Sequence, residues 1–558
     1  MIRLQKATLA IFTITCLLLC LLYVSALVGS EISAGATPST WVVDGNGTGA
    51  FKTIQQAVNH ANPGDTIRVH NGTYYEQVFI NKSISLIGGS ANSTVIDGNR
   101  TGDVVSILAN DVIIEGFTVR RSQIYPSYAG IRVEGSSRVL ISQNKVVNNY
   151  RGIAFYSSSN NSVVDSVVSN NSIDGLGFFS SSSNVVSGNV VSNNFVNGIA
   201  FYSSNNNTLL SNTVLRNSVD GITFSSCVNN LISRNTILSN GNDGITLSSC
   251  INNTISGNTI SSNSLNGLIL FYSGNNLIYH NNFNENAFQV LSEPTSVSTW
   301  SHDGEGNYWS DYKGKNLNGS GIGDIPYDID SNNKDQYPLM GIFSVFYATF
   351  KGKTYEITAI CNSTISGFRF EIGPETGNRI ILFNVTGKLG ASGFCRITIP
   401  TELMDNSSIV MVGQEELSAP PLLPVSNEIL AYLYFTYVDG TQTVRIISSE
   451  AMRSYGQLLA RYIKLQGSLH GVNLSYNILL DNYTLLVSSY NKLQETYRAL
   501  NASYQGHLLD YSESTQNLRN LTYIFAFATG VLIISVIYLS RRKHAAVPTE
   551  TKTFGEKK

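Results

Sequence analysis

A column of aspartate and asparagine residues is the strongest candidate for catalytic chemistry in this chain. Its members each precede a glycine and follow one another every 23 residues: Asp174, Asn197, Asp220, Asp243 and Asn266. If each copy is one turn of a stacked structure, Asp220 and Asp243 lie on strands about 4.8 Å apart. Retaining glycosidases hold two carboxylates about 5 Å apart, and mutual repulsion raises the pKa of one of them. We favour the alternative, ordinary Asp-Gly turn chemistry, because asparagine replaces aspartate within the column.

A second candidate site is a row of aromatic residues at the same spacing, formed by Tyr156, Phe179 and Tyr202. Strand alternation directs Phe155 inward and therefore Tyr156 outward. Outward rings on three successive turns can stack on the faces of sugar rings, or they can be covered by a neighbouring domain. The sequence leaves both possibilities open.

Candidate metal ligands are concentrated in one segment of twelve residues. It holds five side chains with hard oxygen donors: Asp324, Asp328, Asp330, Asn332 and Asp335. This composition is typical of a calcium loop, and a solvated turn that caps the last coil is the equal alternative. The seven histidines are scattered and form no cluster of soft ligands, so we do not expect copper.

The elements that must position these residues follow from a repeat in the middle of the chain. Glycines recur 22 residues apart once and then 23 apart five times: Gly130, Gly152, Gly175, Gly198, Gly221, Gly244 and Gly267. Short alternating apolar runs within each copy are typical of strands. Stacked copies of this kind predict a parallel β-helix over residues 40–341, with an amphipathic helix within residues 51–65 covering its open end.

Polar columns in the repeat are predicted to be structural. One asparagine column runs from Asn149 to Asn286 and another from Asn161 to Asn276, and stacked amides of this kind can hydrogen-bond along the axis at tight corners. Cys227 and Cys250 occupy a column otherwise filled by serine. We expect two unpaired thiols there, because parallel side chains hold the Cβ atoms too far apart for a disulfide.

The C-terminal half predicts three further parts. Residues 342–449 alternate as in an antiparallel sandwich, in which Cys361 and Cys395 are a plausible disulfide. Residues 450–520 place tyrosine and leucine at heptad positions a and d, which predicts a coiled-coil stalk and a homo-oligomer; a lone amphipathic helix is the alternative. Residues 521–540 are long and apolar enough to span a membrane.

The two ends and the overall composition indicate an exported protein. Residues 1–34 resemble a secretory signal, with an uncleaved anchor as the alternative, and the basic residues that follow the apolar span place the tail, 541–558, in the cytoplasm. Seventeen N-x-S/T sequons lie between the two apolar segments and favour glycosylation. Charged residues make up 13% of the chain with a net charge of −2, so no nucleic-acid partner is expected.

The chain resembles the pectate-lyase-like superfamily of right-handed parallel β-helices. The segment WVVDGNGTGAFKTIQQAV followed by DTIRVHNGTYYEQVFINKSISLIGG is similar to the opening of carbohydrate-esterase and NosD-like β-helices. The repeats and the segment GNYWSDYKGKNLNGSGIGDIPYDIDSNNKDQYPLMG resemble NosD-type domains, and residues 342–449 are similar to modules that follow such β-helices in archaeal surface proteins. The resemblance implies a scaffold that binds carbohydrate or metal.

These observations predict a single-pass protein of the cell surface, mainly β in structure, that displays a β-helix head on a stalk. Its expected role is adhesive or structural, with carbohydrate or neighbouring surface proteins as partners and no enzymatic activity. The first alternative is a polysaccharide-degrading enzyme that uses Asp220 and Asp243, and the second is a copper-binding protein. Calcium is the one cofactor for which the sequence offers ligands.

Overall fold

The computed structural model describes the chain from residue 38 to residue 541, apart from short segments at 46, 48, 126, 405–407, 418–428, 439, 449 and 507–513. The predicted signal segment, residues 1–34, and residues 542–558 of the predicted tail lie outside the described residues. The chain divides into a β-rich unit that ends at Ser454 and a helical unit that begins at Tyr455.

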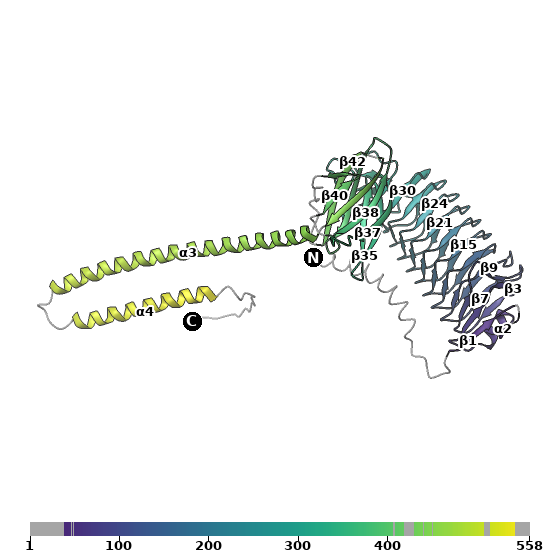
Figure 1. Cartoon of the computed structure of the whole chain (residues 1–558), viewed down its shortest axis with the longest axis horizontal. Helices are drawn as coiled ribbons and strands as arrows, with labels where there is room; N and C mark the ends of the chain where they lie inside the picture. Colours follow the sequence, from purple (N-terminus) through teal and green to yellow (C-terminus); the bar gives the residue numbers. More distant parts are fainter. Residues whose placement is uncertain are drawn as a thin grey trace, which may run out of the picture. The chain divides into compact units, whose positions relative to one another are not determined.

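Three parallel sheets form a β-helix in the first unit (Figure 1). Sheet A contains β1 (Thr40–Val43), β2 (Thr66–Val69), β5 (Ser85–Gly88), β8 (Ile113–Glu115), β11 (Leu140–Ser142), β14 (Ser162–Val164), β17 (Val185–Ser187), β20 (Thr208–Leu210), β23 (Leu231–Ser233), β26 (Thr254–Ser256) and β29 (Leu277–Tyr279). Sheet B contains β3 (Gly72–Tyr75), β6 (Thr94–Asp97), β9 (Thr118–Arg120), β12 (Lys145–Val147), β15 (Val167–Ser169), β18 (Val190–Ser192), β21 (Thr213–Leu215), β24 (Thr236–Leu238), β27 (Thr259–Ser261), β30 (Asn282–Asn284) and β32 (Tyr308–Trp309). Sheet C contains β4 (Val78–Ile80), β7 (Val105–Ile107), β10 (Ala129–Glu134), β13 (Arg151–Tyr156), β16 (Leu176–Phe179), β19 (Ile199–Tyr202), β22 (Ile222–Ser225), β25 (Ile245–Ser248), β28 (Asn266–Phe271) and β31 (Phe288–Ser292).

Like residues stack on like residues in the interior, as the repeat predicts. The register pairs Phe155 with Phe178, Phe178 with Phe201, and Phe201 with Phe224. These four rings are fully buried and lie nearly parallel, with centroids 4.7, 4.4 and 4.7 Å apart. The apolar columns therefore make one continuous core along the β-helix.

The predicted cap at the N-terminal end is confirmed as the short helix α2 (Ile54–His60). It buries Ile54, Ala57 and Val58 against the first turns. The carboxylate of Glu76 accepts hydrogen bonds from the backbone N–H groups of Ile54 and Gln55, each at 2.8 Å. These bonds satisfy donors that the first turn of a helix otherwise leaves unpaired.

The corners are held by ladders of asparagine side chains. At Asn217, for example, Oδ1 accepts bonds from the backbone N–H and the side-chain amide of Asn194, at 3.1 and 2.9 Å, while its own amide donates to Asn240 at 3.0 Å. Both predicted columns are ladders of this kind. A third ladder, which the sequence did not suggest, lies at the corner after sheet A. It includes Asn144 and Ser166 and then runs through asparagines from Asn189 to Asn307.

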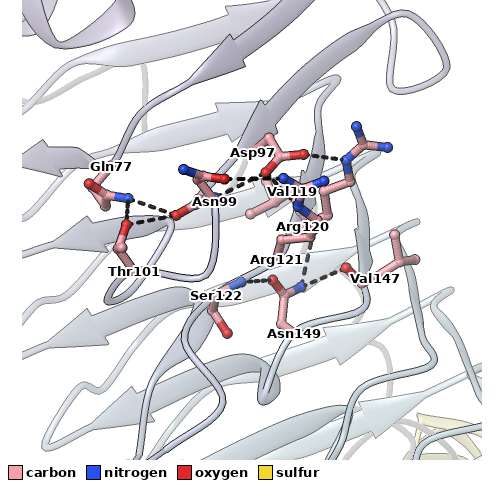
Figure 2. A network of polar contacts seen from close by, with 11 residues as sticks. Gln77, Asp97, Asn99, Thr101, Val119, Arg120, Arg121, Ser122, Val147 and Asn149 are labelled. Carbon is pink, nitrogen blue, oxygen red and sulfur yellow. Dashed lines mark hydrogen bonds and ion pairs between the residues drawn. The ribbon is translucent and has the colours of Figure 1, made fainter.

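Buried carboxylates lie beside the polar columns near both ends of the β-helix. Figure 2 shows the corner after β6, where the buried Asp97 lies 2.8 Å from Arg120 Nε and 3.0 Å from Arg121 Nε. Asn149 begins its ladder beside this network, accepting from the backbone of Ser122 at 3.0 Å. At the far end the third ladder finishes on Asp335, which accepts from the backbone of Asn307 at 2.7 Å.

The serine column is a ladder too, and two cysteines replace serine in it. The backbone N–H of Ser204 points to Cys227 Sγ at 3.4 Å, that of Cys227 points to Cys250 Sγ at 3.3 Å, and that of Cys250 donates to Ser273 Oγ at 2.9 Å. Both cysteines are buried free thiols in this structure. Each thiol therefore serves as the acceptor that a serine supplies elsewhere.

An antiparallel sandwich follows the β-helix, as predicted. One sheet has the order β35 (Ile342–Phe350), β36 (Lys353–Cys361), β39 (Ser392–Pro400), β42 (Leu430–Val438). The other has the order β37 (Thr364–Ile372), β38 (Arg379–Thr386), β43 (Thr441–Ser448), β40 (Ile409–Val412), β41 (Glu415–Leu417). The two sheets enclose a separate apolar core. A short hairpin of β33 (Tyr327–Asp328) and β34 (Lys334–Asp335) precedes them.

A buried ionic cluster fixes the sandwich to the last turns of the β-helix. Glu305 contacts Arg396 of β39 and lies 2.8 Å from His280 Nε2, and the His280 ring stacks on Phe343 of β35 at 4.0 Å. Asn282 exchanges two 2.8 Å hydrogen bonds with the backbone of Phe343. The junction therefore lies at the corner between sheets A and B.

Two helices make up the second unit. The helix α3 (Glu450–Gly506) covers most of the predicted stalk, and α4 (Ser514–Arg541) contains the predicted span. The segment Arg519–Ile537 of α4 is long and apolar enough to cross a membrane.

We predict that Asn217→Ala lowers the free energy of unfolding of the β-helix by about 2 to 3 kcal/mol. The substitution leaves the buried backbone N–H of Asn194 without its acceptor and removes one of the two acceptors of its amide, the other being the Val168 carbonyl. An unpaired buried group costs about 1 to 3 kcal/mol. Urea denaturation followed by circular dichroism measures the change. The control is Asn242→Ala, at a half-buried position outside the ladders; equal losses in the two variants would contradict a special role for the ladder.

We predict that the junction weakens below pH 4.5. Burial alone raises the pKa of Glu305, but the hydrogen bond from His280 and the charge of Arg396 outweigh it and hold the pKa at about 2, below the ordinary 4.5. The stabilisation is complete above pH 4.5 and is lost as pH falls toward 2, at most about 3 kcal/mol. Denaturation at pH 7, 4 and 3, followed by tryptophan fluorescence, measures it. The part due to Glu305 is absent in Glu305→Gln, and an unchanged pH dependence in that variant would refute the assignment.

Candidate functional site

The outer surface of sheet C carries both candidate sites from the sequence. The register aligns Tyr156 with Phe179 and Phe179 with Tyr202, at the ends of β13, β16 and β19. The aspartate column lies at the other end of these strands, directly before each repeat glycine. We call this surface, between the two columns, the sheet C face.

The aromatic side chains point outward, as predicted, but they stack on one another. The Tyr156 and Phe179 centroids are 4.9 Å apart at 10°, and those of Phe179 and Tyr202 are 5.2 Å apart at 8°. The guanidinium of Arg132 lies 4.2 Å from the centre of the Tyr156 ring. Both faces of Tyr156 and Phe179 are therefore occupied, so only Tyr202 offers a ring face to a ligand.

Small residues beneath the rings leave room for the rings to fold back over the strands. A Cβ at Gly177 would come within 2.9 Å of the Phe179 ring. The neighbouring positions are Ala154 and Ala200, both fully buried. Beyond Tyr202 the same two columns continue as Thr223 and Ser225. Because the next two residues of its column are Ser225 and Ser248, the face of Tyr202 turned toward Ser225 has no aromatic neighbour among the described residues.

The aspartate column is a hydrogen-bond ladder that runs in the opposite sense to the asparagine ladders. Each side chain accepts the backbone N–H of the following turn: Asp220 Oδ1 from Asp243 at 3.3 Å, and Asp243 Oδ1 from Asn266 at 2.9 Å. Asn197 accepts from Asp220 in the same way at 3.4 Å. Aspartate and asparagine interchange in this column because only the side-chain oxygen is needed as an acceptor.

The second oxygen of Asp220 is also engaged. It accepts from the hydroxyls of Thr223 and Thr246, at 3.1 and 2.9 Å. Burial raises the pKa of Asp220, Thr246 opposes this, and the charge of Asp243 adds to it. Burial likewise raises the pKa of Asp174, against the opposing charge of Arg151, whose Nε lies 3.7 Å from it. The column is thus a partly buried row of carboxylates with one arginine beside it.

Three contributors to this face were missed in the sequence: Arg151, Thr223 and Thr246. Arg151 lies at the start of β13, and its guanidinium is 5.3 Å from the Phe179 ring. The sequence did indicate that Thr223 and Thr246 face outward. They occupy the same column as Ala154 and Ala200, and in each strand this column lies between two inward-facing residues. Arg151 replaces the aspartate of the later copies, so the repeat itself gave no reason to single it out.

The two outcomes left open for the aromatic row can now be compared. Arg234 contacts Glu356 and Tyr347 of the sandwich, and His280 and Asn282 contact Phe343. All of these contacts lie at the corner between sheets A and B. Among the described residues, the sandwich is therefore joined to the β-helix away from the sheet C face.

The five predicted calcium ligands are not brought together. Asp324 accepts from the backbone of Lys315 at 2.6 Å, and Asp328 pairs with Lys334 at 2.8 Å. Asp330 accepts from the backbone of Asn332 at 2.7 Å in a turn, and Asp335 is fully buried at the end of a ladder. In the described part of the chain, no three His, Cys, Asp or Glu side chains gather as a metal site. These contacts are those of a turn-rich cap on the last coil, and calcium binding stays a prediction.

Cys361 and Cys395 face each other across paired strands of the sandwich. The backbone of Asn362 donates to Phe394, which makes the cysteines a non-hydrogen-bonded pair, where Cα atoms lie about 4.5 Å apart. Both are thiols in this structure, and Cys361 Sγ lies 3.3 Å from the hydroxyl of Tyr437. The disulfide remains a prediction, for exported conditions, at positions that suit it.

Comparison with known proteins matches the β-helix to one family. The model described as "Periplasmic copper-binding protein (NosD)" matches residues 58–194 and 110–314. The probable ABC transporter binding protein NosD of Stutzerimonas stutzeri is 47% identical over 47 residues, 8% of this chain and 11% of that protein. Pectinesterase 5 of Arabidopsis thaliana is 42% identical over 80 residues, 13% of each chain. The chain thus spans only a small part of either relative.

Solved structures show similarity at the level of the fold. Pectate lyase Pel9A aligns at 15% identity with a TM-score of 0.35, over 49% of this chain and 75% of its own. The periplasmic alginate epimerase AlgG aligns at 19% identity with a TM-score of 0.28, over 46% and 67%. Tailspike protein 2 of Escherichia coli O157:H7 bacteriophage CAB120 aligns at 12% identity with a TM-score of 0.41, over 74% and 71%.

The side chains of the described residues do not fit the copper centre that the family description implies. His280 is bonded to Glu305, and His302 lies 3.8 Å from Asp303. His70 lies 3.5 Å from Asp44 at the other end of the β-helix. These imidazoles are dispersed and engaged with carboxylates, whereas copper sites converge several nitrogen and sulfur donors.

We predict that Asp220→Asn leaves the free energy of unfolding within about 1 kcal/mol of the parent, whereas Asp220→Ala lowers it by about 1 to 3 kcal/mol. Asparagine keeps the oxygen that accepts from Asp243 and removes a buried charge, while alanine leaves that N–H unpaired. Thermal and urea denaturation of both variants measure the difference. Equal losses in the two variants would show that the charge, not the acceptor, is what the fold requires.

Proposed function

The β-helix of this chain belongs to the NosD family of pectate-lyase-like parallel β-helices, and we propose that its sheet C face binds an extended, uncharged carbohydrate. The observation that carries the proposal is the ring face of Tyr202. It lies at the end of β19, on the same periodic face as the carboxylate ladder, which runs along the start of the sheet C strands. Aromatic faces of this kind pack against the apolar faces of sugar rings.

The surroundings of Tyr202 supply the polar contacts that a sugar needs. Burial raises the pKa of the Tyr202 hydroxyl, the charges of Asp174 and Asp220 add to this, and Arg151 opposes it. Arg151 lies 3.7 Å from Asp174 and 5.3 Å from the Phe179 ring that stacks on Tyr202, so these groups border the same part of the face. Because strands repeat about every 4.8 Å, equivalent donors and acceptors recur along the face. A polymer with a repeating unit can use them in succession.

The charge of the face favours a neutral glycan. Asp174, Asp220 and Asp243 line one side, and Arg151 is the cation beside them. The names of the pectate lyase and the alginate epimerase refer to acidic polysaccharides. A uronate would meet like charges here, which costs binding energy. We therefore propose a substrate class different from those of the named β-helix enzymes.

Binding without cleavage is the form of the proposal that the contacts support. The two oxygens of Asp220 accept three hydrogen bonds, from Asp243, Thr223 and Thr246. A carboxylate held in this way is an acceptor in the scaffold, and protonation to act as a general acid would disturb those bonds. A glycosidase-like enzyme that uses Asp220 and Asp243 is the alternative.

The setting that we propose is the cell surface. The apolar segment Arg519–Ile537 of α4 would anchor the chain in the membrane, and the head would lie outside, carrying the sequons. The alignment with extracytoplasmic β-helix proteins supports this setting. Adhesion to carbohydrate of the envelope or of another cell is the role that follows.

We predict that Tyr202→Ala weakens binding of neutral oligosaccharides by about tenfold, because the open ring face is lost. The measurement is titration calorimetry with a panel of neutral oligosaccharides, with polygalacturonate and alginate fragments for comparison. Tyr75→Ala is the matched control, since Tyr75 is an exposed tyrosine on sheet B. Unchanged binding by Tyr202→Ala, or preferential binding of the acidic fragments, would refute the proposal.

The enzyme alternative is tested on the same preparations by the release of reducing sugar. The proposal expects none from the parent protein. Release that disappears in Asp243→Asn would establish the hydrolase instead.

A further inference from the structure

The helix α3 exposes a regular apolar seam on its surface. Among the side chains of α3 that the structure describes, five tyrosines occupy the heptad a position, and each is between 53% and 63% exposed: Tyr462, Tyr476, Tyr483, Tyr490 and Tyr497. The d positions between Leu465 and Leu493 are apolar as well and are 39% to 69% exposed. A seam of this length is unusual for a soluble helix without a partner.

The composition of α3 does not support a helix that stands alone. Residues 461–499 contain six Lys, Arg, Asp and Glu residues and many Asn, Ser, Thr and Tyr residues, which have modest helix propensity. Solitary long helices depend on networks of charged pairs three and four residues apart. The side chains of α3 form no ion pair among the described residues. The helix therefore needs burial of its apolar seam.

The residues that flank the seam are suited to a close neighbour. At the g positions, Ser468, Ser475 and Thr496 donate their hydroxyls to backbone carbonyls of the preceding turn, at 3.0, 2.9 and 2.8 Å. At the e positions, Gln466 donates to the hydroxyl of Tyr462 at 2.9 Å. These polar groups are satisfied within the helix, so a neighbour can cover them at little cost.

We infer that α3 pairs with α3 of a second copy of this chain, in parallel and in register, through the tyrosine and leucine seam. Charged residues at e and g usually set the choice of a different partner, and Arg461 is the one charge at these positions between 461 and 499. A self-complementary apolar seam is then the best match for itself. The α4 segments, if they lie in one membrane, hold the two helices in the same direction.

The surface available is large enough for a stable complex. A packed aromatic side chain buries about 150 to 250 Å². Even half of that, from five tyrosines on each of two chains, comes to about 1,000 Å², which is the size at which specific interfaces begin. The leucines add to it. The inference is independent of the carbohydrate site, although two heads on one stalk would bind a polymer with higher avidity.

Disulfide cross-linking of the full chain in membranes tests the inference. Leu479→Cys and Leu486→Cys place a thiol at d, and Asp481→Cys and Ser488→Cys place one at f in the same two heptads, on the opposite side of the helix. With a mild thiol oxidant we expect covalent dimers from the d variants at least tenfold above the f variants. The parent chain has six cysteines, of which those at 227, 250, 361 and 395 are buried thiols in the described residues, and it gives the background.

A second measurement does not depend on cysteine. Sedimentation of the full chain in detergent should give a multiple of the monomer mass, and Tyr476→Ser combined with Tyr483→Ser should reduce it to that of the monomer. Equal cross-linking at d and f, no cross-linking at d, or a mass unchanged by the double substitution would each overturn the inference. The last result would assign association to α4.

Discussion

The structure depends on one kind of hydrogen bond, in which a corner side chain accepts the backbone N–H of a neighbouring turn. A parallel β-helix satisfies its strands through the sheets, but the corners leave buried N–H groups that no strand can reach. Asparagine oxygens supply the acceptor in three ladders, and serine or cysteine supplies it in a fourth. These corner bonds hold successive turns at a constant spacing, and the apolar columns therefore stack in register.

The candidate site is a by-product of the same constraint. The aspartate column supplies backbone acceptors, and in doing so it places carboxylates at regular intervals along one edge of sheet C. The aromatic stack needs the small residues at 154, 177 and 200, which leave room for rings to lie against the sheet. Chemistry on this face is therefore limited to groups that the fold can spare, namely Tyr202, Arg151 and the free edges of the rings.

Much of the fold could be predicted from the sequence, because the constant spacing of the repeat shows which residues align from one turn to the next. Once Gly130 to Gly267 are aligned, the interior columns, two corner ladders and the cysteine positions follow from alternation. The capping helix was equally clear from its apolar spacing. The third ladder was harder to see because a serine, Ser166, interrupts it near its start.

The details of the site were less accessible, because they depend on contacts between turns and between modules. Nothing in the spacing of Tyr156, Phe179 and Tyr202 says that the rings occupy one another's faces. Asp324 to Asp335 have a calcium-like spacing, but Asp335 accepts a hydrogen bond at the end of a ladder and Asp328 pairs with Lys334. The Glu305 cluster joins residues about 90 positions apart, on modules with no shared period.

Because the ladders repeat from turn to turn, the β-helix can have more or fewer turns without a change in its corner bonds. Each turn between the Asp97 network and Asp335 is bonded through its corner ladders to the turns before and after it, by side chains that recur from turn to turn. Insertion or loss of whole 23-residue units would leave those bonds intact and alter how many equivalent positions sheet C offers. Evolution, or an engineer, can in this way change the reach of the surface without redesigning its chemistry.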